Sequence, residues 1–257
     1  MARLQSSSRL LLVASLVAVA APLVGQTPET GTIGGRITLT TRARGRPLAS
    51  ATYPTRTVTP HDAPTGPEIR NVIVHLTGVT LRSALPATRV VMRQEHETFI
   101  PHVLAVTKGS TVEFPNADPF FHNVFSLHDG VRFDLGLYEH GNSKIVRFSK
   151  PGASFIFCNI HPEMSAVIMV MNSPYYAATD AKGAFSIADV PSGEYQLPIW
   201  HERAMENQLK SLSRRLTVGI SPVSVESLKI DQTAGAAEHH KNKFGMDYEA
   251  QPPYKTP

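Results

Sequence analysis

The only cysteine of the sequence, Cys158, is followed by His161 and Met164 in the stretch FCNIHPEM. A thiolate, an imidazole and a thioether within seven residues form a soft set of metal ligands. Magnesium and calcium prefer oxygen ligands, whereas sulfur and imidazole nitrogen suit copper. The stretch therefore predicts a copper site and not a site for a hard cation.

A trigonal copper–thiolate site needs a second imidazole, because such sites combine two histidines with the thiolate and a weak axial methionine. His122, in FPNADPFFHNVFS, lies 36 residues before Cys158 and begins an expected strand. In a β-sandwich, a loop that enters one strand and a loop that leaves another can meet at the same end. We therefore predict that His122 completes the site.

Short strands must position these residues. Alternating apolar runs separated by glycine and proline are typical of all-β sandwiches and barrels. Between residues 89 and 171 the expected strands are TRVVM, HVLAVT, STVEFPN, HNVFSL, KIVRFS, SFIFCNI and SAVIMVM. In the strand before the ligand loop, Ile156 and Cys158 face one side and Phe155 and Phe157 the other. Cys158 therefore lies at the end of its strand, where the following turn can fold His161 and Met164 over an ion.

HN, then CxxHxxM on a loop after an aromatic-rich strand, resembles the cupredoxin family of blue copper proteins, with amicyanin-like spacing. HETFIPHVLAVTKGSTVEF resembles the strands that open the cupredoxin core, so the resemblance covers residues 88–172 and implies a Greek-key β-sandwich. It implies His122, Cys158 and His161 as equatorial ligands of one type 1 copper ion and Met164 as the axial ligand. It also implies that Asn123 forms a hydrogen bond across to the copper loop.

The same resemblance implies that Phe120, Phe121 and Pro162 form part of an apolar surround of the metal. The chain departs from the family pattern in FPN, which replaces the more usual tryptophan or aromatic context, and in FDLGLYEHG, an insertion without an assigned role.

The flanking segments, residues 27–87 and 173–232, resemble a carboxypeptidase-regulatory-like or transthyretin-like β-sandwich through the pattern DxxGxFxIxxVPxGxYxLxxWHE. The expected elements are strands in GTIGGRITLT and NVIVHL, a proline-rich loop over 46–68, a β meander from residue 175, a short helix within 203–216 and two final strands. Residues 233–257 are predicted to be a disordered tail, because they have few apolar side chains. The whole chain is similar to exported proteins called methylamine-utilisation-like, a label that implies no methylamine chemistry.

Residues 1–26 resemble a secretory signal peptide, with Arg3 and Arg9 ahead of an apolar run of small and aliphatic residues. We expect a periplasmic or otherwise exported protein, attached to a membrane only if this segment stays uncleaved. Its removal lowers the formal net charge from +4 to +2 and leaves scattered basic residues, which argues against nucleic-acid binding. A single cysteine cannot form an intrachain disulfide in that oxidising compartment.

These observations predict one-electron transfer with an unidentified redox protein as partner. No HxH pair is present for a second copper centre, no CxxCH for haem, and one thiol cannot perform dithiol chemistry, so we do not expect an enzyme. The alternatives are a module that stores, delivers or senses copper, and a metal-free interaction domain. His75, His96 and His102, in or beside strands, are interpreted as structural.

Overall fold

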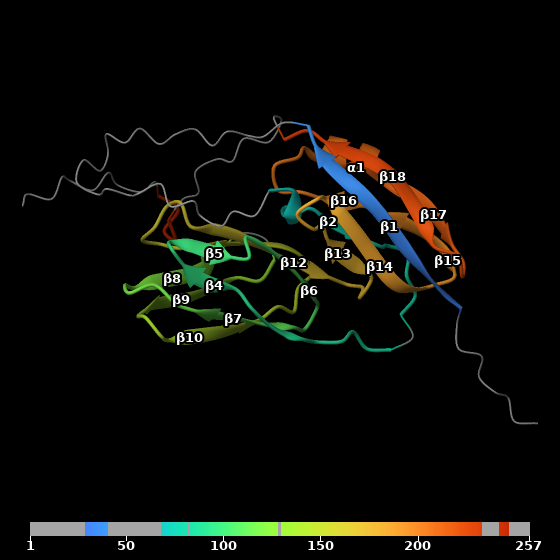
Figure 1. Ribbon diagram of the computed structural model, residues 1–257. Helices are drawn as coiled ribbons and strands as arrows, with labels where there is room; N and C mark the ends of the chain where they lie inside the picture. The colour runs from blue at the N-terminus through green and yellow to red at the C-terminus, as the bar shows by residue number, and fades with distance from the viewer. Residues whose placement is uncertain (1–28, 41–67, 82, 128–129, 233–241, 247–257) are drawn as a thin grey trace, which may run out of the picture.

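The computed structural model describes residues 29–40, 68–81, 83–127, 130–232 and 242–246. Two groups of strands pack side by side (Figure 1). The central half contains β3 to β12, and the flanking half contains β1, β2, α1 and β13 to β18. Strands dominate both halves, as predicted, and no helix in the described ranges is long and apolar enough to cross a membrane.

The central half is built from two sheets and a hairpin. A five-stranded sheet has the order β6-β12-β11-β8-β9, a three-stranded sheet has the order β10-β7-β3, and β4 pairs with β5. β6 runs parallel to β12 and β3 parallel to β7, while the other pairs are antiparallel. The strands are β3 (Arg89–Val91), β4 (Arg93–Glu95), β5 (Thr98–Ile100), β6 (Val103–Thr107), β7 (Thr111–Pro115), β8 (His122–Ser126), β9 (Phe133–Tyr138), β10 (Ser143–Arg147), β11 (Gly152–Phe157) and β12 (Ser165–Met171).

One side chain in two from these strands enters a common core. Phe114, Val124 and Ile156 are fully buried there, and Cys158 packs in the same cluster. Phe155 lies on the opposite face of β11, in a different cluster, as the alternation of the strand predicts. The turn at Gly109, with φ of 95°, and the turn at Gly152, with φ of 108°, adopt the left-handed backbone that glycine allows.

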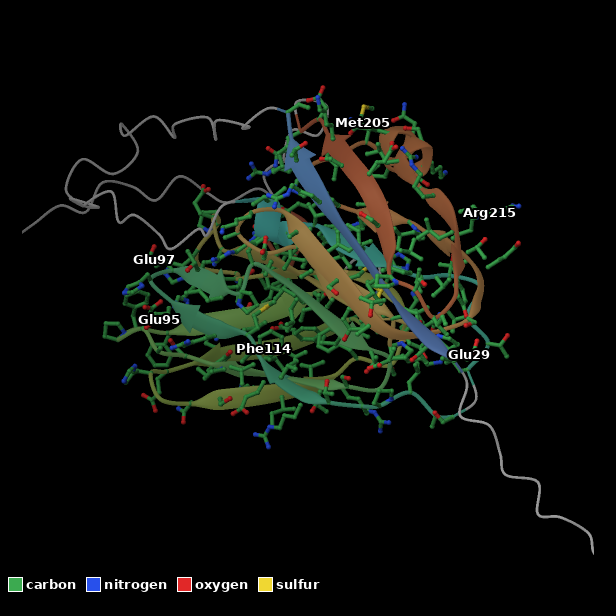
Figure 2. The ribbon with its side chains drawn as sticks, turned by 45° about the vertical axis from the view of Figure 1, so that its right-hand side comes forward. Glu29, Glu95, Glu97, Phe114, Met205 and Arg215 are labelled. Atoms are coloured by element: carbon green, nitrogen blue, oxygen red, sulfur yellow. The ribbon has the colours of Figure 1, made fainter. Side chains whose placement is uncertain are left out.

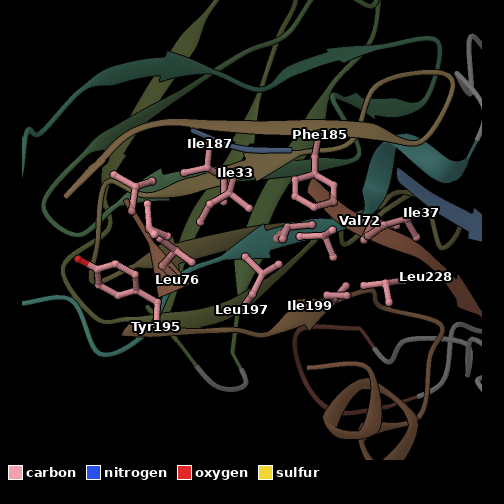
Figure 3. Close-up of a cluster of buried hydrophobic side chains, with 14 of the residues drawn as sticks. Ile33, Ile37, Val72, Leu76, Phe185, Ile187, Tyr195, Leu197, Ile199 and Leu228 are labelled. Atoms are coloured by element: carbon pink, nitrogen blue, oxygen red, sulfur yellow. The ribbon is translucent and has the colours of Figure 1, made fainter. Parts of the chain in front are cut away.

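The flanking half combines segments from both ends of the described chain. β1 lies between β14 and β18, β2 lies between β13 and β16, and β15 pairs with β17. The strands before and after the central half therefore form one structure around a shared core, which Figure 3 shows in close-up. The elements are β1 (Thr30–Leu39), η2 (Glu68–Asn71), β2 (Ile73–His75), β13 (Tyr176–Ala178), β14 (Ala184–Pro191), β15 (Gly193–Leu197), β16 (Ile199–Trp200), α1 (Glu206–Leu212), β17 (Arg214–Val218) and β18 (Val223–Ile230).

Two sequence-based predictions need correction. The segment from residue 175 is not a meander, because β14 pairs with β1 and β15 with β17 instead of with each other. The segment FDLGLYEHG is not a separate insertion, because it contains β9, which extends the five-stranded sheet beside β8. The short helix expected within 203–216 is present as Glu206–Leu212, and β17 begins at Arg214, directly after the C-cap residue Ser213.

The two halves meet through a small apolar cluster and an ion pair. Ile73 of the flanking half packs with Val103, Val167, Met169 and Met171 of the central half, and Trp200 lies against them. His102 and Glu202 form an ion pair of 2.7 Å across the same junction. Figure 2 shows Phe114 within the central half and Met205 and Arg215 on the far side of the flanking half.

Residues 242–246 contact the central half, although 233–257 was predicted to be a disordered tail. Lys243 donates from its backbone N–H to Asn159 Oδ1 at 3.0 Å, and its Nζ lies 2.9 Å from Asp134 Oδ2. These two polar contacts attach the segment to the central half, and disorder in the tail stays a prediction. The predicted signal segment, residues 46–67 of the predicted proline-rich loop and the rest of the predicted tail lie outside the described residues.

Candidate metal centre

Two neighbouring strands bring His122 and Cys158 to one end of the five-stranded sheet. β8 begins at His122, and β11 ends at Phe157, directly before Cys158. The strands run antiparallel, with Phe157 opposite Phe125. The start of one therefore lies near the end of the other, which places residues 36 apart in the sequence beside each other.

The loop after β11 folds back on itself. The backbone N–H of Cys158 donates to the carbonyl of Met164 at 3.2 Å, and the N–H of Met164 donates to the carbonyl of His161 at 3.0 Å. These two hydrogen bonds close the loop between β11 and β12. His161 is thereby held above Cys158, and the side chain of Met164 enters the buried cluster that contains the cysteine.

Three side-chain atoms converge at this end of the sheet. Cys158 Sγ lies 3.5 Å from His161 Nδ1 and 3.9 Å from His122 Nδ1, and the two Nδ1 atoms are 3.0 Å apart. A triangle with these sides has one central point that is about 2.0 Å from all three atoms, close to the lengths of metal–nitrogen and metal–sulfur bonds. The spacing of the three ligand atoms therefore suits a single transition-metal ion.

The centre is shielded from solvent. His122 and Cys158 are fully buried, and His161 is half-buried. The ring of Phe120 packs edge-on against His122, with centroids 5.2 Å apart, and lies 5.5 Å from the ring of His161. Phe121, which was predicted to be part of the apolar surround, is instead 52% exposed, and Pro162 is half-buried.

Burial raises the pKa of the Cys158 thiol, although backbone N–H groups of Asn123, Ile160 and His161 that point at the sulfur partly offset this effect. In the absence of a cation the group is therefore a neutral thiol at neutral pH. A bound metal would favour the thiolate, so metal binding would release a proton.

The other two predicted site residues are Met164 and Asn123. The side chain of Met164 packs in the buried cluster of Cys158, whereas Asn123 contacts Cys158 through its backbone. Met164 is 1% exposed and belongs to the cluster around Cys158. Asn123 was expected to form a hydrogen bond across to the copper loop, and its backbone N–H does point at the sulfur of Cys158, where that loop begins. The Asn123 side chain bonds the neighbouring strand and not the loop, because its Nδ2 donates to Asp134 Oδ1 on β9 at 2.8 Å.

Asp118 is a residue at this centre that the sequence reasoning missed. Its Oδ2 lies 2.8 Å from His122 Nε2, on the side of the ring opposite to the sulfur. Burial raises the pKa of the Asp118 carboxyl, but hydrogen bonds from the Glu97 backbone, His122 and the His96 backbone outweigh it, so the pKa lies below its ordinary value. The only sequence signal was an aspartate four residues before the histidine.

Within the described residues, His122, Cys158 and His161 are the one group of three or more histidine, cysteine or acidic side chains whose ligand atoms all lie within 4.8 Å of one another. The expected ligand set is therefore present as a geometric cluster, with Met164 in the same buried core.

No protein-family model matches the chain, and a search of curated proteins finds no match. Among solved structures, the chain is similar to a variant of amicyanin in its reduced Cu(I) form, with 20% identity, a TM-score of 0.31, and 35% of this chain and 87% of that chain covered. A purple cupredoxin from Nitrosopumilus maritimus has 21% identity and a TM-score of 0.29, over 34% of this chain and 100% of the other.

A copper-containing nitrite reductase from Thermus scotoductus SA-01 has 29% identity and a TM-score of 0.31 over 38% of this chain. The matched region spans about a quarter (25%) of that enzyme.

Proposed function

We propose that this chain is an exported copper protein that transfers single electrons through a type 1 copper site formed by His122, Cys158 and His161. One observation carries the proposal. Two imidazole nitrogens and one sulfur, all from buried or half-buried side chains, surround a point about 2 Å from each. The resemblance of the HN and CxxHxxM motifs to cupredoxins adds Met164 as the axial ligand and a Greek-key sandwich as the surrounding fold.

Copper, when bound, supplies one-electron cycling between Cu(II) and Cu(I) with no substrate bond made or broken. The residues of the chain keep the ligands in place during that cycle. The backbone bonds between Cys158, His161 and Met164 fix the ligand loop, and strand pairing fixes His122. Because the ligands are held by the fold, little rearrangement accompanies the change of charge, which favours fast electron exchange.

We also propose that electrons pass between the copper and a redox partner through His161. His161 is the only one of the three that is not fully buried, and its neighbour Ile160 is 39% exposed. Phe121, beside His122, is also exposed. An apolar surface around His161 suits brief docking of a redox protein, which would bring its own centre close to the copper. The protein would meet this partner in the periplasm or another exported location, as residues 1–26 suggest.

Absorption spectroscopy of the purified copper-loaded protein tests the assignment. We expect an intense visible band from thiolate-to-copper charge transfer that bleaches on reduction and returns on oxidation. A protein that stores or delivers Cu(I) would stay colourless and pass its copper to an acceptor. A colourless protein after loading and oxidation would therefore refute the electron-transfer proposal in favour of that alternative.

Cys158→Ser is the matching variant. Serine keeps nearly the same volume but removes the sulfur, so we expect the band to disappear while the circular dichroism of the strands is retained. Ser154→Ala is a suitable control, because Ser154 is also buried on β11 but its hydroxyl accepts the backbone N–H of Val131 at 3.0 Å and lies outside the cluster of ligand atoms. An unchanged visible band in the Cys158→Ser protein would exclude the thiolate as a ligand.

A further inference from the structure

The side-chain carboxylate of Asp118, a residue that is only 4% exposed, takes part in three hydrogen bonds. Its Oδ1 accepts the backbone N–H of His96 at 2.6 Å. Its Oδ2 accepts the backbone N–H of Glu97 at 2.9 Å and faces Nε2 of His122 at 2.8 Å. The carboxylate therefore joins the turn between β4 and β5 to one of the proposed copper ligands.

The contact with Asp118 determines which ring nitrogen of His122 carries the proton. An ionised carboxylate can only accept hydrogen bonds, so Nε2 must be the donor. In the neutral ring, Nδ1 then has a lone pair, and Nδ1 is the atom that faces Cys158 Sγ and His161 Nδ1. Asp118 thus selects the tautomer that a metal ion at the centre requires.

The carboxylate itself is held firmly. Asn116 Oδ1 accepts the backbone N–H of Asp118 at 3.0 Å, and Asn116 Nδ2 donates to the carbonyls of Phe120 and Tyr138. His96 and Glu97 both have positive φ, at 57° and 55°, and their N–H groups point together toward the carboxylate. Glu97 lies at the end of the central half remote from the flanking half (Figure 2).

We propose that Asp118 is a positioning residue that fixes the tautomer and ring orientation of His122 by tying this ligand to the β4–β5 turn. The copper part of this inference rests on the proposed function, whereas the tautomer part concerns the copper-free protein. An anionic partner also makes the imidazole a better electron donor, which stabilises Cu(II) relative to Cu(I).

Nuclear magnetic resonance of the copper-free, 15N-labelled wild-type protein tests the tautomer directly. We expect a His122 ring proton on Nε2 and an unprotonated Nδ1. A proton on Nδ1 with an unprotonated Nε2 would overturn the inference. This measurement needs no variant and no metal, so it stands even if a substitution at Asp118 prevents folding or the copper proposal fails.

Asp118→Asn tests the effect on the metal. If the new amide nitrogen takes the place of Oδ2, it donates to His122 Nε2 and moves the ring proton to Nδ1, which a metal must then displace. If it takes the place of Oδ1, the His96 N–H loses its acceptor and the turn loosens. Either way we expect copper affinity, measured by competition with a chelator, to fall by about 10–100-fold and the reduction potential to rise.

Asp180→Asn is the matched control. Asp180 also caps a turn, accepting the backbone N–H groups of Lys182 at 2.8 Å and Ala184 at 2.9 Å, but it lies in the flanking half and, among the residues that the structure describes, bonds no histidine. We expect wild-type copper affinity and potential in this variant. If Asp118→Asn also bound copper with wild-type affinity and potential, the inference would be overturned, even if the visible band confirmed the copper site. Absence of the band from wild-type protein would refute the proposed function separately.

Discussion

The ion pair between His102 and Glu202 predicts a pH-dependent stability of the junction between the two halves. His102 Nδ1 lies 3.0 Å from the carbonyl of Ser165, and its Nε2 lies 2.7 Å from Glu202 Oε1. Both partners are acceptors, so both ring nitrogens must donate and the site favours the imidazolium. Burial lowers the pKa of His102, but the hydrogen bond and charge of Glu202 outweigh it, and the pKa lies above its ordinary value.

The directions of the two pKa shifts determine how the stability contribution of the pair changes with pH. Because the pKa of His102 is raised in the folded protein, its contribution is complete below the unfolded value of about 6.5 and is lost as pH rises through the folded value. The pKa of Glu202 is lowered, although burial alone raises it, because His102 bonds and attracts the carboxylate. The contribution of Glu202 to stability is complete above about pH 4.3, its unfolded pKa, and is lost as the pH falls through its folded pKa. The pair is therefore most stabilising between about pH 5 and 6.5.

A hydrogen bond to a charged group contributes about 1.5–3 kcal/mol, but these side chains are 33% and 17% exposed, so solvent screening reduces the value to about 1 kcal/mol. We expect the free energy of unfolding to fall by about that amount between roughly pH 6 and pH 8. Urea denaturation of the copper-free protein can follow it through the fluorescence of Trp200, the only tryptophan, which lies at the junction.

Glu202→Gln should lower the free energy of unfolding at pH about 6 by about 1 kcal/mol and remove most of its decrease toward pH 8. Glu206→Gln is the control, because the Glu206 side chain is 81% exposed and pairs with Lys210 on the surface of α1. If the free energy of unfolding of the Glu202→Gln protein fell as much between these pH values as that of the wild type, the reasoning about His102 would be refuted.

Three further predictions concern substitutions in the core, at two glycines and at the proposed axial ligand. Phe114→Ala should reduce the free energy of unfolding by about 3–5 kcal/mol in urea denaturation, because the ring is fully buried in the central core; a loss below about 1 kcal/mol would contradict that packing. Gly183→Ala should destabilise more than Gly141→Ala under the same assay, because both glycines have φ near 76° but a Cβ at Gly183 would lie 2.0 Å from the carbonyl oxygen of Ile37, whereas Gly141 has open space. Equal losses of unfolding free energy in the two variants would show that the backbone around residue 183 shifts without an energetic cost. Met164→Leu should raise the reduction potential, measured by voltammetry, and keep the visible band; complete loss of copper binding would show that Met164 does more than a weak axial ligand.

The sequence predicted the faces of individual strands well but not their neighbours. Ile33 and Ile37 of β1 and Val72 and Val74 around β2 are buried as their alternation indicates. Nothing in that alternation determines that β1 lies between β14 and β18, because any strand with one apolar face can cover the same core. The expected meander was wrong for this reason.

The set of candidate ligands was determined by the sequence alone. A single cysteine with His161 and Met164 at fixed spacing on one loop restricts the chemistry, because the ligand type follows from the side chain and the loop is too short to separate the three. The need for a second imidazole followed from copper chemistry, and His122 was the candidate at the start of a strand.

Only the tertiary structure decided how these groups meet and what surrounds them. Antiparallel pairing of β8 with β11 brings His122 Nδ1 to 3.9 Å from Cys158 Sγ. The fold also turns Asn123 toward Asp134 and places Asp118 behind His122. Hydrogen-bond partners depend on where remote strands place individual atoms, and local spacing carries no information about that placement. The sequence thus determined which side chains could bind a metal, and the packing of the sheets decided their distances, protons and partners.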